Sequence, residues 1–222
     1  MGIFSIFTIN APFYVILIVL FAYILALLFS IIIHEFMHAF VAFKMGDPTA
    51  KLAGRMSFNP AKHFDPVGMI CMVCFGFGWA KGVPVNPNLF RNYKKGQIAV
   101  SLAGVSTNLV LGVVFTFLSV VANLFFDSNV LILLFLQYLF AYLAITNYVL
   151  AVFNLLPIYP LDGFSFLEAF LPYDNKFMMF MRKYGVIILL LLLVSYAIPF
   201  LMTQVINLCY YDLASVFAKI FV

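Results

Sequence analysis

Four long apolar runs constrain the fold of this chain more than any other feature of its sequence. A helix needs about 20 mostly apolar residues to cross a hydrocarbon core of about 30 Å, and each run is long enough. The sequence therefore predicts an all-α polytopic membrane protein with about four to five transmembrane helices. The runs are Pro12–Phe43, Gln97–Phe126, Val130–Leu156 and Tyr184–Leu208.

The composition supports this class and excludes others. Of the 222 residues, 66% are apolar and only 9% are charged, whereas an ordinary soluble domain is about 45–50% apolar. So few charges cannot cover the surface of a water-soluble globule, which excludes aqueous enzymes, nucleic-acid-binding proteins and disordered tails. The runs are also continuous, whereas the strands of outer-membrane barrels alternate in polarity over about 10 residues.

Two other apolar stretches are less regular. Val67–Ala80 is short for a span and contains three glycines, so we expect a re-entrant or strand-like element between the first and second spans, sheltered by protein. Thr203–Val222 carries Asp212 and Lys219 and fits either an interfacial helix or a poor span. Pro199 is expected to kink or end the fourth long helix.

The basic residues are distributed unevenly, and positive charges favour cytoplasmic loops. The N-terminus and the Asp127–Asn129 turn contain no Lys or Arg. We therefore predict that the N-terminus lies outside, that the basic loops are cytoplasmic, and that Val67–Ala80 does not cross. The basic residues assigned to these loops are Lys44, Lys51, Arg55 and Lys62; Lys81, Arg91, Lys94 and Lys95; and Lys176, Arg182 and Lys183.

The first run contains the cluster His34-Glu35-Phe36-Met37-His38, whereas the other three runs contain no Asp, Glu, Lys, Arg or His. Charged groups inside a membrane are costly and indicate function by default. On a helix, His34 and His38 lie about 40° apart on one face, so they can bind one Zn²⁺ while the adjacent Glu35 takes a proton from water. The alternative is a pair of histidines that form interhelical hydrogen bonds beside an isolated glutamate.

A catalytic zinc needs a third protein ligand. Asp162 is distinctive because Pro157 and Pro160 end the third long helix just before it, so the chain can bend and present Asp162 to the membrane interior. From these residues alone, a capping aspartate in a turn remains equally compatible. The acidic and histidine residues available near the cytoplasmic ends are His63, Asp65, Asp162, Glu168 and Asp174.

These motifs together resemble the site-2 protease family of intramembrane zinc metalloproteases, in particular minimal prokaryotic members without PDZ or CBS domains. The resemblance covers about residues 20–170 and includes a segment like the family's Gly-Pro-x-x-Asn motif. The matching segments are His34–His38, Phe58–Gly68, Phe77–Pro87, Ser101–Asn108 and Asn154–Gly163.

The resemblance implies one Zn²⁺ per chain, with ligands His34, His38 and Asp162 and with Glu35 as the general base. It also implies a substrate-binding role for Asn154, with Asn108 as a second candidate. The chain departs from the family in two positions. Tyr159 and Val105 stand where the family often has proline, so we expect changes in the turn before Asp162 and a straighter helix around Val105, with the catalytic groups retained.

We therefore expect a single domain over residues 1–222, with a catalytic core at about 12–170 and C-terminal helices at about 184–222. It would be a multi-pass zinc endopeptidase that cuts a transmembrane protein substrate near the cytoplasmic face of the bilayer. The alternatives are a catalytically silent zinc-retaining membrane binding protein and a metal-ion transporter. Cys71 and Cys74 have redox-like spacing but lack a basic neighbour, so we expect them to be buried apolar residues.

Overall fold

The computed structural model describes residues 11–63, 65, 66, 68, 70 and 81–221. Within this part of the chain the regular elements are helical, and four helices are long and apolar enough to cross a membrane. The predicted all-α class is therefore confirmed. The four helices are α2 (Phe13–Met45), α6 (Tyr93–Phe125), α7 (Leu131–Asn154) and α9 (Lys176–Val194).

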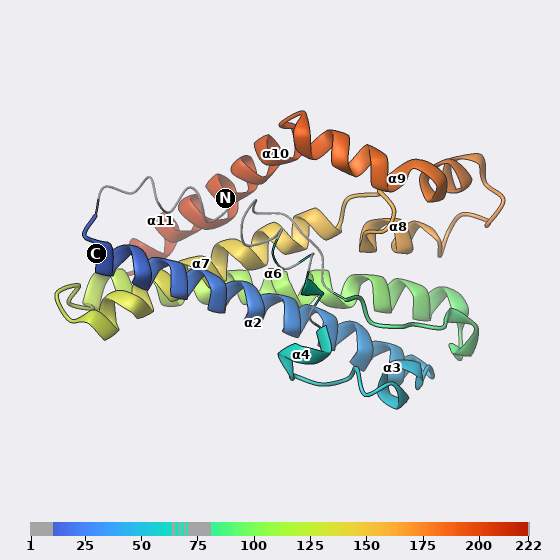
Figure 1. Ribbon diagram of the computed structural model, residues 1–222, viewed down its shortest axis with the longest axis horizontal. Helices are drawn as coiled ribbons and strands as arrows, with labels where there is room; N and C mark the ends of the chain where they lie inside the picture. Colours follow the sequence, from blue (N-terminus) through green and yellow to red (C-terminus); the bar gives the residue numbers. More distant parts are fainter. Residues whose placement is uncertain (1–10, 64, 67, 69, 71–80, 222) are drawn as a thin grey trace.

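Helices α2, α6 and α7 form the core of the molecule, and they run side by side with alternating direction (Figure 1). Small residues on the facing sides let the backbones approach closely, as is common in membrane bundles. On α6, Gly112 packs against the ring of Tyr148 on α7, and a methyl group at position 112 would lie 2.6 Å from that ring. The buried faces therefore place residues of α2, α6 and α7 in direct contact.

Helix α9 begins and ends earlier in the chain than the sequence predicted. It runs from Lys176 to Val194 rather than from Tyr184 onward, so the basic residues assigned to a loop lie inside the helix. Arg182 is tolerated there because it pairs with Glu168 at 2.8 Å and lies over the ring of Tyr173. Its charge thus stays near the helix end, where long basic side chains reach the membrane interface.

The break after α9 occurs at Tyr196, whose φ of 64° is left-handed, rather than at Pro199. Pro199 instead lies in the first turn of α10 (Ala197–Ile206), where its missing N–H is not needed. A π-helix (Asn207–Asp212) and α11 (Leu213–Ala218) follow. This C-terminal unit packs along α6 and α7 (Figure 1), and the buried Tyr210 hydroxyl lies 2.9 Å from that of Ser119 on α6.

The chain between α2 and α6 contains the short helices α3 (Thr49–Leu52) and α4 (Pro60–His63) and the 3-10 helix η1 (Pro87–Leu89). Most of Val67–Ala80, including Cys71 and Cys74, lies outside the described residues, and the predictions for this stretch remain predictions. The chain after it is fixed to α2 and its loop, because the buried Asp47 carboxylate accepts hydrogen bonds from the N–H groups of Thr49 and Asn86 at 2.9 and 2.7 Å.

Candidate metal site

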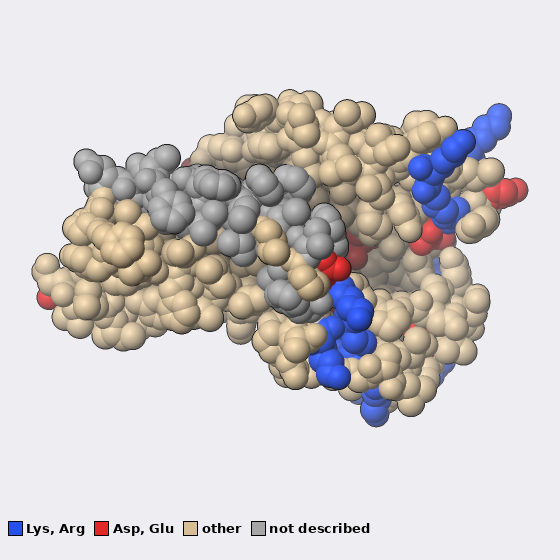
Figure 2. Space-filling model, in the orientation of Figure 1, with Lys and Arg blue, Asp and Glu red and all other residues tan. Residues whose placement is uncertain are grey.

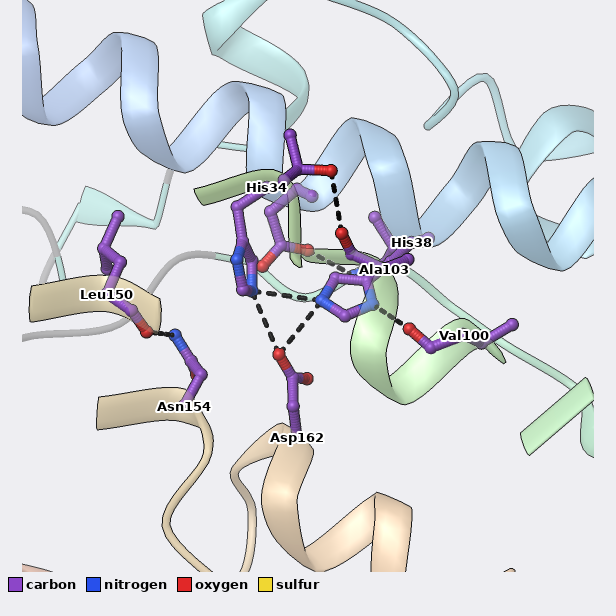
Figure 3. Close-up of polar contacts among 10 residues, drawn as sticks. His34, His38, Val100, Ala103, Leu150, Asn154 and Asp162 are labelled. Atoms are coloured by element: carbon purple, nitrogen blue, oxygen red, sulfur yellow. Dashed lines mark hydrogen bonds and ion pairs between the residues drawn. The ribbon is translucent and has the colours of Figure 1, made fainter. Parts of the chain in front are cut away.

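His34 and His38 lie on one face of α2 and point toward α6 (Figure 3). Both are buried, with 5% and 7% of their surface exposed, and their Nε2 atoms are 3.0 Å apart. Nδ1 of His38 lies 2.8 Å from the carbonyl oxygen of Val100 on α6. If this nitrogen donates its proton to Val100, Nε2 of His38 presents a lone pair, which is the form that binds a metal.

Asp162 is the first residue of α8 (Asp162–Leu167), and its carboxylate points toward both histidines (Figure 3). Oδ2 lies 3.2 Å from Nε2 of His34 and 3.1 Å from Nε2 of His38. Burial alone raises the pKa of this carboxyl, but the neighbouring imidazoles lower the pKa more, to well below its ordinary value. This direction favours the ionised carboxylate, which is the form that binds a metal.

The turn between α7 and α8 is compact, which brings Asp162 back toward the histidines. A methyl group on Gly163 would lie 2.1 Å from the carbonyl oxygen of Leu155, so only glycine fits here. On the other side of α8, the side-chain amide of Gln97 on α6 donates to the carbonyl oxygen of Ser165 at 2.9 Å. These contacts hold α8 between the end of α7 and the beginning of α6.

The three ligand atoms fit a zinc ion. They are separated from one another by 3.0, 3.1 and 3.2 Å, whereas adjacent ligands of a tetrahedral zinc with bonds of about 2.0 Å lie ~3.3 Å apart. Two imidazole nitrogens and a carboxylate oxygen form a typical donor set for a catalytic zinc, which keeps one position open. Among the described residues, this is the one group of histidines, cysteines and acids arranged to hold a metal.

Glu35 lies next to His34 on α2 and is partly buried. Its Oε2 accepts a hydrogen bond of 3.0 Å from the N–H of Val83, in the extended chain that precedes η1. Arg55 holds the same chain in place, because its guanidinium donates to the carbonyl oxygens of Lys81 and Gly82. The carboxylate of Glu35 is thus oriented by backbone that is itself anchored.

The other predicted third ligands do not join this group. His63 bonds the carbonyl oxygen of Ser57, Asp65 accepts from the N–H of Gly68, and Glu168 pairs with Arg182. Asp174 is exposed on the loop before α9. Of the five candidates, only Asp162 lies with the histidines.

The two residues predicted to bind substrate, Asn154 and Asn108, lie on different helices. Asn154 ends α7 beside the group (Figure 3), and its amide nitrogen donates to the carbonyl oxygen of Leu150 at 3.0 Å. Asn108 is fully buried in α6. Their roles in substrate binding stay predictions.

The two departures from the family pattern leave the group intact. The ring of Tyr159 packs edge-to-face on Phe164 of α8, at 5.6 Å between centroids. The backbone of Tyr159 lies against Gly185 of α9, where a methyl group on Gly185 would lie 2.7 Å from the carbonyl oxygen of Tyr159. Val105 is buried, and α6 continues through it without a break, as expected.

Sequence reasoning missed Gly104, which lies on α6 against both histidines. A methyl group at position 104 would lie 2.4 Å from Cε1 of His34 and 2.6 Å from Nε2 of His38. A glycine inside a helical pattern is a weak signal of close packing. The sequence contains 12 glycines, however, and nothing in it shows that this one faces the histidines.

We expect Gly104→Ala to reduce the zinc content of the purified protein strongly, because the added methyl group displaces the ligand nitrogens. The matched control is Gly82→Ala, where a methyl group would meet nothing within 4 Å. Metal analysis of both variants at equal purity measures the difference. A Gly104→Ala protein with the zinc content of wild type would show that the histidines shift at no cost.

The ligand atoms of His34, His38 and Asp162 form a buried triangle that could hold a metal, and Glu35 lies beside it on a helix long and apolar enough to span a membrane. This arrangement is typical of membrane metallohydrolases. Comparison with known proteins gives the same class. Residues 127–192 match the model of peptidase family M50. The putative zinc metalloprotease YwhC of Bacillus subtilis is 34% identical over 206 residues, which cover 89% of this chain and 91% of the relative.

Two further relatives carry the name putative zinc metalloprotease Rip2. The one from Mycolicibacterium smegmatis is 32% identical and is matched over 77% of this chain and 66% of its own length. The one from Mycobacterium tuberculosis H37Rv is 30% identical, with 76% and 64% covered. No solved structure matches the chain. The chain belongs to the site-2 protease family, peptidase family M50, of membrane zinc metalloproteases.

Proposed function

We propose that this protein is an intramembrane zinc endopeptidase that hydrolyses a peptide bond within or next to a transmembrane segment of a protein substrate. The observation that carries the proposal is the His34–His38–Asp162 triangle, with Glu35 next to it on a helix whose apolar window has a mean hydropathy of 3.2. Structural zinc sites do not need a carboxylate that accepts protons, so Glu35 supports catalysis over a zinc-retaining binding protein.

The chemistry divides between the metal and Glu35. Zinc held by His34, His38 and Asp162 would supply Lewis acidity toward water and toward the scissile carbonyl group. The carboxylate of Glu35 accepts the proton of the attacking water and then gives it to the leaving amine. The N–H of Val83, which bonds Oε2 at 3.0 Å, keeps the carboxylate oriented. Asn154 at the end of α7 is proposed to position the substrate.

We further propose that the site opens toward the cytoplasm. In Figure 2, the Lys and Arg side chains of the visible face gather at the end of the molecule where α3 and the beginning of α9 lie. The loop between α6 and α7, at the opposite end in Figure 1, contains no Lys or Arg. This asymmetry fits the preference of basic residues for the cytoplasmic side, and the α7–α8 turn with Asp162 belongs to the basic end.

Cleavage of a model transmembrane substrate in detergent tests the proposed function. We expect wild type to cut the substrate, a zinc chelator to stop the reaction, and added Zn²⁺ to restore it. A protein that binds zinc but never cleaves would be a silent binding protein. Zinc flux into vesicles by purified protein without proteolysis would indicate a transporter. The described α7 contains no Asp, Glu, Lys, Arg or His, which speaks against this alternative.

Labelling of single cysteines tests the orientation. We expect cysteines at Lys51, Arg91 and Lys176, which are all exposed, to react with a membrane-impermeant reagent only from the cytoplasm. A cysteine at Ser128, in the loop between α6 and α7, should react only from outside. Reaction of positions 51 and 91 from opposite sides would contradict this topology, because Val67–Ala80 would then cross the membrane.

A further inference from the structure

The two histidines of the metal site differ in what holds their outer nitrogens. Nδ1 of His38 has the carbonyl oxygen of Val100 at 2.8 Å. Nδ1 of His34 is buried and has no hydrogen-bonding partner among the described residues. A histidine that binds a metal almost always donates its other N–H to a carbonyl, a carboxylate or a water, because this bond fixes the tautomer and the orientation of the ring. His34 therefore requires a partner that the ligand set does not supply.

A layer of buried polar residues lies one helical turn from the histidines, toward the N-terminal end of α2. Ser30 precedes His34 by four positions on α2, and Asn108 follows Gly104 by four positions on α6, so each shares a face with its neighbour. Gly104 is in contact with both histidines. Because α2 and α6 run in opposite directions (Figure 1), Ser30 and Asn108 are displaced to the same side of the metal site.

Helix α7 completes this layer with Asn147. The Nδ2 of Asn147 donates to Oγ of Ser30 and to the carbonyl oxygen of Leu143, both at 2.8 Å. Ser30, Asn108 and Asn147 are each 0% exposed. Both amide atoms of Asn108 and Oδ1 of Asn147 have no hydrogen-bonding partner among the described residues. Buried polar atoms in native proteins are nearly always satisfied by protein or by ordered water.

We propose that Asn108 is a positioning residue for His34, and that it acts with Asn147 through a bound water. Water accepts the proton of Nδ1 of His34 and donates to the amide oxygens of Asn108 and Asn147, which gives it the two to four polar partners that an interior water needs. Nδ1 of His34 then carries the proton, and Nε2 keeps its lone pair toward the metal. The inference rests on the zinc site of the proposed function and not on the cleavage reaction.

Zinc affinity of the full-length protein in detergent tests this role, measured by competition with a chromophoric chelator. We expect Asn108→Leu, which keeps the approximate size of the side chain, to bind zinc about 10–100-fold more weakly than wild type. The control is Thr116→Val on the same face of α6. Thr116 is also 0% exposed and bonds the Tyr148 hydroxyl, but it lies two turns beyond Asn108, so its loss should leave zinc affinity unchanged.

The absorption spectrum of the Co²⁺-substituted protein gives a second readout, because its visible bands report the geometry of the ligands. We expect the bands of Asn108→Leu to shift and those of Thr116→Val to match wild type. If Asn108→Leu does not fold, Asn108→Ser replaces it. The serine hydroxyl still accepts from water, so zinc binding should weaken, but by less than the roughly 10–100-fold expected when the contact is lost.

Three outcomes overturn the inference. Unchanged zinc affinity in Asn108→Leu and in Asn108→Ser would show that Asn108 has only a structural role. Unchanged affinity with a raised KM for the model substrate would show that Asn108 contacts the substrate instead. A wild-type protein that does not bind zinc would overturn the proposed function and this inference together.

Discussion

Replacing Glu35 with glutamine is expected to reduce cleavage of a model transmembrane substrate by about 10²–10⁴-fold while zinc stays bound. Glutamine has the size of glutamate but cannot accept a proton from water, and loss of a general base typically costs this much in rate. The hydrogen bond from the N–H of Val83 to Oε2 can be kept by the amide oxygen. The side chain therefore stays in place while its chemistry is lost.

The matched control is Glu168→Gln. Glu168 pairs with Arg182 at 2.8 Å at the end of α8, and the amide oxygen of glutamine can still accept the hydrogen bond of the guanidinium. We expect this variant to retain most of its activity and its zinc. The measurement is the rate of cleavage together with the metal content of the same preparation. Cleavage by Glu35→Gln at a rate near that of wild type would mean that another group takes the proton.

The candidate metal site was predictable to the extent that its residues are unusual in their surroundings. His34, Glu35 and His38 are conspicuous because the rest of their run is apolar, and helical geometry places the two histidines on one face. Asp162 became a candidate because the prolines before it end a helix. Its approach to the histidines required the third dimension, since nothing local in the sequence distinguishes it from an aspartate that caps a turn.

The contacts that surround the ligands were not predictable from one sequence. Gly104, Val100 and Val83 carry no chemistry of their own, and each matters only because the fold brings it against Glu35 or a histidine. The bounds of α9 were missed for a related reason. Arg182 was interpreted as a loop residue, but its partner Glu168 lies 14 positions away and makes a charge acceptable inside the helix.

The second large effect is expected at Asp162. Asp162→Ala removes one of the three proposed ligands, whose atoms lie within 4.8 Å of one another, and the two remaining imidazoles would leave zinc short of the usual number of protein ligands. We expect metal content to fall from about one zinc per chain to a small fraction. Affinity should drop by more than the roughly 10–100-fold cost of losing an outer partner of a ligand, and cleavage should be lost with the metal.

Two alanine variants separate this role from a general effect of losing a carboxylate near the site. Asp65→Ala removes an acceptor for the N–H of Gly68, and Glu168→Ala removes the partner of Arg182. Neither carboxylate belongs to the triangle, so both variants should retain zinc.

The zinc content of Asp162→Ala would also bear on topology. If the chain between α2 and α6 crossed the membrane, α7 would deliver Asp162 to the opposite side of a core about 30 Å thick, where it could form no bond of about 2 Å to a zinc held by His34 and His38. Full zinc content in Asp162→Ala, with loss of metal in Asp65→Ala or Glu168→Ala, would therefore contradict both the third ligand and the arrangement of helices that delivers it.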